Sequence, residues 1–182
     1  MKNIIHFKKI GSTQNYAKKI ARCSPSNTII IAEKQTSGRG QFERGWSSSR
    51  GGLYFSIILK PKIVPDKIPL LTLKMASAIV STLKKIVKKK HSVLTKPPND
   101  VIVKCKTGYR KIAGILTESS VTGNKIDWVV VGIGVNINNK IPKELKKIAV
   151  SLKEITKKNG NVKKIFKEIV KKFVITNRID FL

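Results

Sequence analysis

Arginine is concentrated in one glycine-rich stretch of a chain that elsewhere uses lysine as its cation. Of six arginines beside 32 lysines (38 basic residues less six), Arg39, Arg44 and Arg50 fall within twelve residues. The guanidinium group is a rigid planar fork that holds phosphate or carboxylate through two hydrogen bonds. Gly38 and Gly40 lack a Cβ, so backbone N–H groups near them can approach a ligand closely. The stretch is therefore predicted to wrap an anion.

Further polar segments supply cations, amides, hydroxyls and a carboxylate at predicted strand ends and loops. They contain no nucleophile paired with a base, and His6 and His91 are the only histidines of the chain, so a catalytic triad or a histidine-based metal site is excluded. This inventory suits a reaction that works by positioning and charge neutralisation, such as attack of a carboxylate on a nucleotide phosphate. The segments are Ser12–Thr13, Gln35–Gly40, Lys96–Asp100, Lys111–Glu118 and Gly132–Asn138.

Two familiar phosphate-binding signatures are incomplete. Gly40 and Gly45 have the spacing of a P-loop, but Trp46 stands where that motif needs lysine. The dinucleotide fingerprint that begins at Gly38 fails at Glu43, which replaces its third glycine. Neither fold family is predicted.

The composition is that of one globular domain, residues 1–182. Apolar residues make up 41% and charged residues 26% of the chain, as in folded proteins. No apolar run approaches the roughly 18 residues of a membrane span, and the N-terminus lacks a secretory signal, so no membrane association is expected. Cys23 and Cys105 are isolated, which is typical of a reducing compartment, and a cytoplasmic location is expected.

The formal net charge of +28 raises the hypothesis of a nucleic-acid-binding protein. Against it, the lysines are spread through nearly every segment, without a basic arm, an arginine-rich tract or an aromatic RNA-binding motif. A solvated, lysine-rich surface explains the charge as well. No specific nucleic-acid partner is predicted, although non-specific adhesion at low salt is expected.

The hydrophobic pattern predicts the elements that position the polar segments. Short apolar runs between turn residues predict strands, and apolar residues spaced by three and four predict helices. The longest helix is expected to bury a stripe made of Leu73, Ala76, Val80, Leu83 and Val87. Because few helices alternate with the strands, the pattern predicts an α+β fold with a mixed, mainly antiparallel sheet. Strands are expected at 3–7, 28–32, 53–59, 92–95, 100–104, 111–119 and 125–136, and helices at 13–22, 70–88, 149–155 and 162–173.

The polar segments, in this order, resemble the motifs of the catalytic domain of biotin–protein ligases. That family has a glycine loop of the form GRGRxGRxW, followed by KWPND, KxAGIL(V)E and GIGxNxN, and the resemblance covers about residues 8–155. It implies a mixed sheet backed by helices, as in class II synthetases. It also implies activation of biotin with MgATP to biotinyl-5′-AMP, and then transfer of biotin to a lysine. The implied partner is the biotin carboxyl carrier domain of acetyl-CoA carboxylase or a related carboxylase, and no tightly bound cofactor is implied.

The resemblance assigns roles to individual residues. Lys111, Arg39 and Asp100 are the implied catalytic residues; Asp100 would orient the incoming lysine amine or hold Mg²⁺, and no other metal ligand is implied. The implied nucleotide contacts are Arg44, Trp46, Asn99 and Asn136. The implied biotin contacts are Ser12, Thr13, Gln14, Gln35, Arg39, Gly40, Gln41, Lys111 and Gly114.

Three residues depart from the family pattern. Gln41 replaces an arginine and Glu43 a glycine of the loop, and both changes are expected to weaken retention of an adenylate. Pro97 stands where the family has tryptophan, which removes a large packing surface. From the end of the chain at Leu182, the small C-terminal β-barrel of the family and an N-terminal DNA-binding domain are expected to be absent.

Several functional hypotheses stay open at this point. The leading one is a monofunctional biotin–protein ligase. A lipoate ligase or octanoyl transferase would share the fold, and a degenerate ligase domain would bind biotin or a partner without efficient turnover. A homodimer formed through an exposed sheet edge beside the glycine loop is a further possibility.

Overall fold

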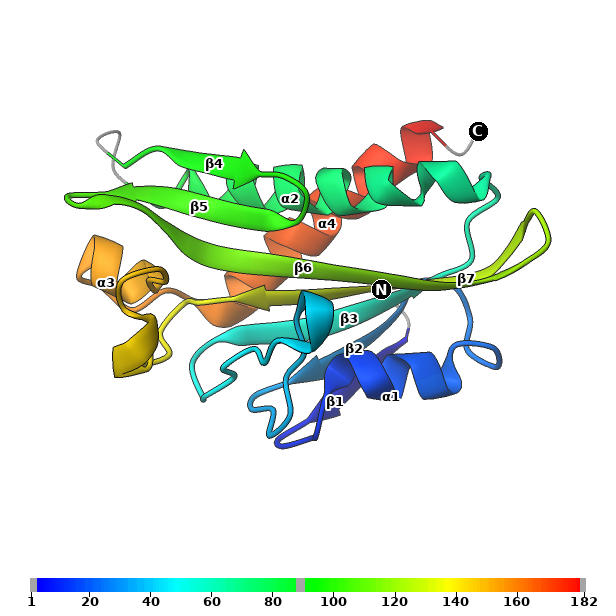
Figure 1. Cartoon of the computed structure of the whole chain (residues 1–182), viewed down its shortest axis with the longest axis horizontal. Coiled ribbons are helices and arrows are strands. Elements are labelled where there is room, and N and C mark those ends of the chain that lie inside the picture. Colours follow the sequence, from blue (N-terminus) through cyan, green and yellow to red (C-terminus); the bar gives the residue numbers. More distant parts are fainter. Residues whose placement is uncertain (1–2, 88–90, 181–182) are drawn as a thin grey trace.

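Seven strands form one sheet in the computed structural model, which describes residues 3–87 and 91–180, with the backbone alone for residue 43 and residues 175–180. The order of the strands is β1-β2-β3-β7-β6-β5-β4 (Figure 1). Neighbouring strands are antiparallel except β1 and β2, which run parallel. The predicted α+β class with a mixed, mainly antiparallel sheet is confirmed. The strands are β1 (Ile4–Phe7), β2 (Thr28–Ala32), β3 (Leu53–Leu59), β4 (Val93–Lys96), β5 (Asp100–Cys105), β6 (Gly108–Thr122) and β7 (Lys125–Val135).

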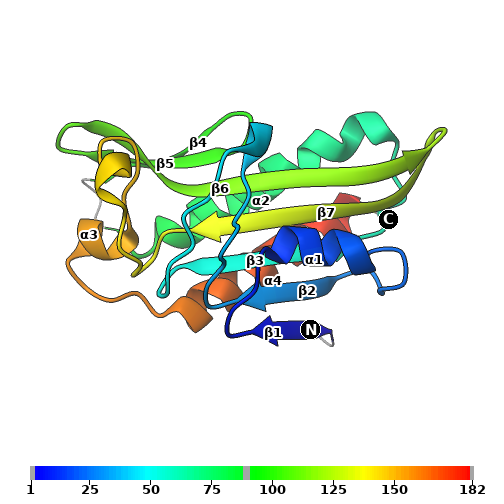
Figure 2. The same cartoon turned by 60° about the horizontal axis from the view of Figure 1, so that its bottom comes forward.

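Helices cover both faces of the sheet (Figures 1 and 2). α2 and α4 pack together on one face over the larger core, and α1 lies on the other face over a smaller core of Ala17, Ile30, Ile58 and Val130. Among the described residues, no helix combines the length and the apolar character needed to cross a bilayer. The helices are α1 (Thr13–Ile20), α2 (Ile68–Leu83), α3 (Leu152–Thr156) and α4 (Val162–Asp180), with 3-10 turns at Gln41–Glu43, Pro65–Lys67 and Lys143–Leu145.

The longest predicted helix, at 70–88, is shifted in the structure. α2 begins earlier, at Ile68, because Pro69 is tolerated in the first turn of a helix, where the missing N–H would have no partner within the helix. It ends at Leu83, and Lys88 lies outside the described residues.

The predicted core stripe of α2 is wrong at one position. Leu73 is 42% exposed, whereas Ala76 and Leu83 are buried as expected. The innermost face of the helix runs through Leu71, Met75 and Ile79. Since apolar residues surround much of this helix, their spacing alone did not define its inner side.

The remaining differences lie at element ends. β6 begins before its predicted range of 111–119, because residues from Gly108 on pair with β5, and it ends later, because it pairs with β7 up to a two-residue turn at Gly123 and Asn124. α3 begins later than the predicted residue 149 because Ser151 caps it: the Ser151 Oγ accepts from the Glu154 N–H, and the Glu154 carboxylate accepts from the Ser151 N–H. This reciprocal capping defines the first turn.

Candidate functional site

The floor of the site is a part of the sheet that α1 leaves open. Residues paired across β3, β7 and β6 point to the same face, because side chains alternate along each strand. Residues that are paired side by side across the three strands form a row. One row, Ile58–Val130–Glu118, lies beside α1, and α1 covers its apolar members Ile58 and Val130. The next two rows consist mainly of small side chains and extend beyond the start of the helix; they are Ser56–Gly132–Leu116 and Tyr54–Gly134–Gly114.

The glycines of this floor admit two large polar side chains. A Cβ on Gly132 would collide with the amide oxygen of Gln14, and a Cβ on Gly134 would collide with the indole of Trp46. Gly114, the cross-strand partner of Gly134, also faces the Trp46 ring, from which a Cβ would lie 2.8 Å. The space beside Gly114, an implied biotin contact, is therefore occupied by the indole in this state.

The start of α1 forms one wall of the site. Ser12 caps the helix by accepting from the Asn15 N–H at 3.3 Å. Thr13 turns toward the site, where its N–H and its Oγ1 both donate to Gln35 Oε1, at 2.8 and 3.1 Å. Gln35 in turn donates to Ser48 Oγ at 2.8 Å. Thr13 and Gln35 are thus joined in one network with Ser48, and Ser12 caps the helix beside it.

This wall has one hydrogen-bond donor too few. Ser56 Oγ lies 3.0 Å from Thr13 Oγ1 and 3.1 Å from Gln14 Oε1. A hydroxyl has one proton, and the Thr13 proton is already directed to Gln35. One of the two Ser56 contacts therefore lacks a proton, and the wall can accept a hydrogen bond from an N–H group of a ligand.

The glycine-rich loop folds back on itself above the floor. The Gly40 N–H donates to the Arg44 carbonyl at 2.7 Å, and the Trp46 N–H donates to the Gly38 carbonyl at 2.9 Å. A Cβ on Gly38 would collide with the Trp46 carbonyl, so this close approach requires glycine. The loop is held down at Arg39, whose guanidinium donates to Asn15 Oδ1 on α1 at 2.9 Å.

Lys111 faces Asp100 across the paired strands β5 and β6. Its Nζ lies 2.6 Å from Asp100 Oδ1 and 5.1 Å from the centre of the Trp46 ring. Asp100 Oδ1 is buried and makes no hydrogen bond of good geometry, so the contact is an ion pair that a better-placed partner can replace. Next to it, Asn99 Nδ2 donates to the Ile115 carbonyl at 3.0 Å, which fixes the β4–β5 turn against β6.

Two cavities meet at Lys111. The inner one, about 40 Å³, lies between the floor, the α1 wall and the loop, and all nine residues predicted to contact biotin line it. The outer one is an open cleft of about 920 Å³, lined by Arg44, Trp46, Asn99 and Asn136, the four residues predicted to contact a nucleotide. Asp100 lines the outer cleft, and Lys111 lines both. The structure thus brings the predicted residues together in two groups.

The departures from the family pattern lie in different places. Gln41 lines both cavities, so it is placed where the missing arginine charge would act. Pro97 belongs to the turn that precedes Asn99. The side chain of Glu43 lies outside the part of the molecule that the structure describes.

Sequence reasoning missed several residues around the cavities. Ser56 is the only serine or threonine of the apolar strand β3, and Glu118 is the only carboxylate of β6; either feature was a usable signal. Tyr109 and Ile148, which are 48% and 64% exposed, line the outer cleft. No three acidic, histidine or cysteine side chains form a potential metal site within the described residues.

Comparison with known proteins agrees with this arrangement. The model of the biotin/lipoate A/B protein ligase family matches residues 6–136. The bifunctional ligase/repressor BirA of Bacillus subtilis is 38% identical over 157 residues, which cover 84% of this chain and 46% of that protein. The biotin–[acetyl-CoA-carboxylase] ligase of Paracoccus denitrificans is 32% identical over 71% of this chain and 52% of its own length. The chain thus spans about half the length of these relatives.

Solved structures give the same result. The biotin protein ligase from Aquifex aeolicus in complex with biotin and ATP superposes with a TM-score of 0.78 at 34% identity, covering 96% of this chain and 69% of that one. The Leishmania major enzyme in complex with biotinyl-5-AMP, at 24% identity, has the same fold with a TM-score of 0.76. From the match over residues 6–136, the chain belongs to the biotin/lipoate A/B protein ligase family.

Proposed function

We propose that the protein is a biotin–protein ligase, which activates biotin with MgATP and transfers it to a lysine of a carboxylase biotin carrier domain. The observation that carries the proposal is the meeting of two cavities at Lys111, one lined by amide and hydroxyl groups and the other open and cationic. An acid bound in the inner cavity and a nucleotide bound in the outer one would present their reacting groups to the same ammonium group.

Biotin fits the polar wall by its chemistry. Its ureido ring carries two N–H donors and a carbonyl acceptor, and the wall at Ser56, Thr13 and Gln14 lacks a donor. Lipoyl and octanoyl groups have no N–H to offer, so the spare acceptor capacity of this wall would gain no partner from them. The wall therefore favours biotin over the other acids of the same family.

The inner cavity must open before biotin can enter. Its volume of about 40 Å³ is far below the roughly 300 Å³ at the lower end of ligand pockets. Trp46 and Arg39 form its cover, and both belong to the glycine-rich loop. Entry of biotin thus requires movement of this loop, and the indole lying on Gly114 and Gly134 is the group to be displaced.

The first chemical step follows from the charges around Lys111. A carboxylate oxygen of biotin attacks the α-phosphorus of ATP, and the bond to pyrophosphate breaks as the new P–O bond forms. Lys111 would leave Asp100 and neutralise the negative charge that builds on the shared oxygens. Magnesium arrives with the nucleotide as part of the substrate, and Arg44 and Lys96 in the outer cleft add positive charge beside the phosphates.

The second step uses the same groups. The amine of the carrier lysine attacks the acyl carbon of biotinyl-5′-AMP, an amide bond forms, and AMP leaves with the bonding electrons. Asp100, released from Lys111, would orient the incoming amine and accept its proton, while Lys111 stabilises the tetrahedral oxygen. Because ATP and a carboxylase carrier domain would be its substrates, we propose that the enzyme acts in the cytoplasm.

Pyrophosphate exchange tests the proposal directly. Radiolabelled pyrophosphate should enter ATP only when biotin is present, and neither lipoate nor octanoate should replace biotin. A biotin carrier domain should then gain one biotin in the presence of ATP. Exchange that is equally fast with lipoate, or that needs no acid at all, would remove the basis for the assignment.

A further inference from the structure

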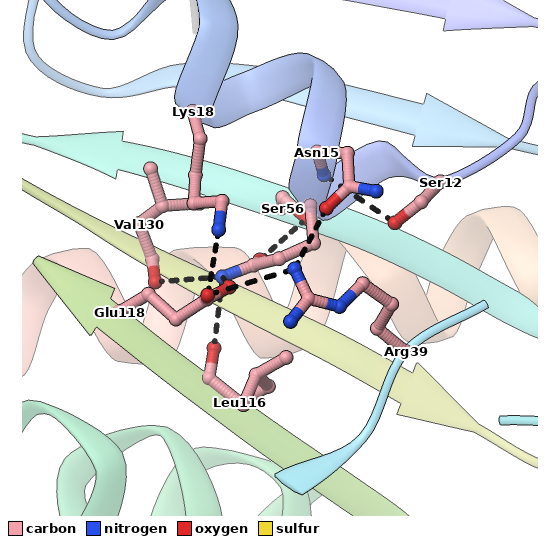
Figure 3. Close-up of polar contacts among 9 residues, drawn as sticks. Ser12, Asn15, Lys18, Arg39, Ser56, Leu116, Glu118 and Val130 are labelled. Carbon is pink, nitrogen blue, oxygen red and sulfur yellow. Dashed lines mark hydrogen bonds and ion pairs between the residues drawn. The ribbon is translucent and has the colours of Figure 1, made fainter. Parts of the chain in front are cut away.

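Glu118 on β6 joins three elements around the inner cavity, and the proposed mechanism does not use it. Its Oε1 lies 2.7 Å from Lys18 Nζ on α1 and 3.7 Å from a guanidinium nitrogen of Arg39 on the glycine-rich loop. Its Oε2 accepts from Gln14 Nε2 at 2.8 Å. Figure 3 shows the carboxylate among these side chains, with the Arg39 side chain reaching toward it from the loop.

The first consequence concerns the direction of the Gln14 amide. Gln14 is buried, and its Nε2 faces three acceptors: Glu118 Oε2 and the carbonyl oxygens of Leu116 and Val130, at 3.4 and 3.3 Å. A flipped amide would place its oxygen against these acceptors, so the nitrogen is held at this end. The Gln14 oxygen must therefore face Ser56, at the inner cavity that both residues line.

The second consequence concerns the loop. Arg39 lines the inner cavity together with its neighbours Gly40 and Gln41, where the loop passes over it. Its guanidinium is held by Asn15 and by the charge of Glu118. The same carboxylate therefore acts on the floor of the cavity through Gln14 and on its cover through Arg39.

We propose that Glu118 is a positioning residue that fixes the polarity of the acid-binding cavity through Gln14 and holds the glycine-rich loop closed through Arg39. A cavity with this polarity selects an acid that carries N–H donors at its far end, such as a cyclic urea. The selection of biotin rests on the proposed function, whereas the effect on the loop does not depend on any ligand.

Lys18 provides a matched control. It makes the shortest contact to Glu118, at 2.7 Å, but it lines neither cavity. Lys18→Met removes this ion pair, keeps most of the side chain's apolar stem, and leaves the contacts from Gln14 and Arg39 in place. If Glu118 is only part of a surface ion pair, Lys18→Met and Glu118→Gln will behave alike.

The first experiment needs no ligand. An arginine-specific protease cuts after few residues in this chain, and Arg44 is an exposed site within the loop. Glu118→Gln should speed cleavage after Arg44 by about two- to five-fold relative to cleavage after Arg22. This range corresponds to the free energy that a partly exposed ion pair contributes. Lys18→Met should change this ratio less than two-fold. Equal ratios in wild type and Glu118→Gln would overturn the effect on the loop.

The second experiment measures steady-state kinetics with biotin. Glu118→Gln should raise the KM for biotin about ten-fold, as for a lost hydrogen bond to a charged group, with kcat and the KM for ATP unchanged. Biotin methylated on a ureido nitrogen should be rejected less strongly by the variant than by the wild type. A fall in kcat at unchanged KM, or an equal effect of Lys18→Met, would overturn the effect on polarity.

The two experiments separate the failure of this proposal from that of the proposed function. A wild-type protein that neither binds nor adenylates biotin would contradict both the proposed function and the selection of biotin through Gln14. The protease ratio would still decide whether Glu118 holds the loop. Thermal unfolding of each variant checks that the fold is intact, and a melting temperature within a few degrees of the wild type assigns the changes to local positioning.

Discussion

At the level of single residues, Lys111 is the group on which the proposed chemistry depends. Its backbone is anchored to residues 148–150, because the Lys111 N–H donates to the Ile148 carbonyl at 2.8 Å and the Val150 N–H donates to the Lys111 carbonyl at 3.0 Å. Its Nζ stands between the two cavities. A fixed ammonium at this point would stabilise the charge that develops in both half-reactions.

We therefore expect Lys111→Gln to lower the rates of adenylation and transfer by about 10²–10³. The side chains of Lys104 and Lys106 are exposed, on β5 and on the turn that follows it. Lys104→Ala and Lys106→Ala should therefore change the rates little. Pyrophosphate exchange and single-turnover transfer measure the two steps, and circular dichroism checks the fold. If Lys111→Gln costs no more than its two neighbours, the assignment of this motif and most of the mechanism are wrong.

Glu118 gives a prediction about pH. Burial alone would raise the pKa of this carboxyl, but the hydrogen bonds from Lys18 and Gln14, together with the charges of Lys18 and Arg39, outweigh it and lower the pKa. A carboxyl with a lowered pKa in the folded state stabilises the fold above its unfolded pKa of about 4.3, and this contribution is lost as the pH falls through the folded value.

The free energy of unfolding of the wild type should therefore fall more steeply below about pH 4.3 than that of Glu118→Gln, which has no proton to gain. Urea unfolding between pH 3 and pH 7 measures the difference. Because Glu118 is partly exposed, the effect is expected to be small, about 1 kcal/mol or less. Parallel curves for the two proteins would show that the carboxyl makes no net contribution.

At the level of elements, the glycine-rich loop is the part expected to respond to ligands. Arg39 ties it to α1, and Trp46 lies on the sheet against Gly114, Gly134 and Lys111. Biotin cannot enter without displacement of this loop. Addition of biotin and ATP should trap the loop over biotinyl-5′-AMP and reduce cleavage after Arg44. Unchanged cleavage at proven occupancy of the site would contradict a closing role.

Gln41 tests the strength of this closure. It lines both cavities and stands where the ligase pattern has arginine. Gln41→Arg should add a charged contact to the adenylate, worth roughly 1.5–3 kcal/mol if well aligned, and slow the release of biotinyl-5′-AMP by about ten-fold or more. Release is measured by chase with unlabelled intermediate. An unchanged release rate would show that this departure is neutral.

The sequence predicted the elements better than their details. The bounds of β2 and β3 were predicted as observed, because turn residues flank their continuous apolar runs. The side of α2 that faces the core was predicted wrongly at Leu73, because apolar residues surround the helix. The two groups of site residues followed from the order of the motifs. The sequence pattern did not specify the pairing register of β6 and β7. That register determines that Trp46 lies on Gly114 and Gly134, and that Glu118 lies beside Gln14.

At the level of the whole molecule, the charge of +28 acts on encounters with other molecules more than on the fold. The outer cleft, through which a carrier lysine would have to enter, is lined by the cations Arg44, Lys96 and Lys147 together with exposed apolar groups at Tyr109 and Ile148. Such a rim suits a carrier domain with an acidic surface around its target lysine.

If the charge steers the carrier, its effect should appear in the association rate. We expect the association rate constant with an acidic carrier domain to fall about ten-fold or more as NaCl rises from 0.02 to 0.5 M, because the screening length shortens from roughly 20 Å to about 4 Å. The dissociation rate constant should change little, since close contacts at the site are screened less than long-range attraction. Stopped-flow mixing with the non-biotinylated carrier measures both constants. A carrier variant with its surface carboxylates replaced by amides is the matched control, and it should associate slowly at every salt concentration. An association rate for the acidic carrier that is independent of salt would show that the lysine-rich surface has no part in partner recognition.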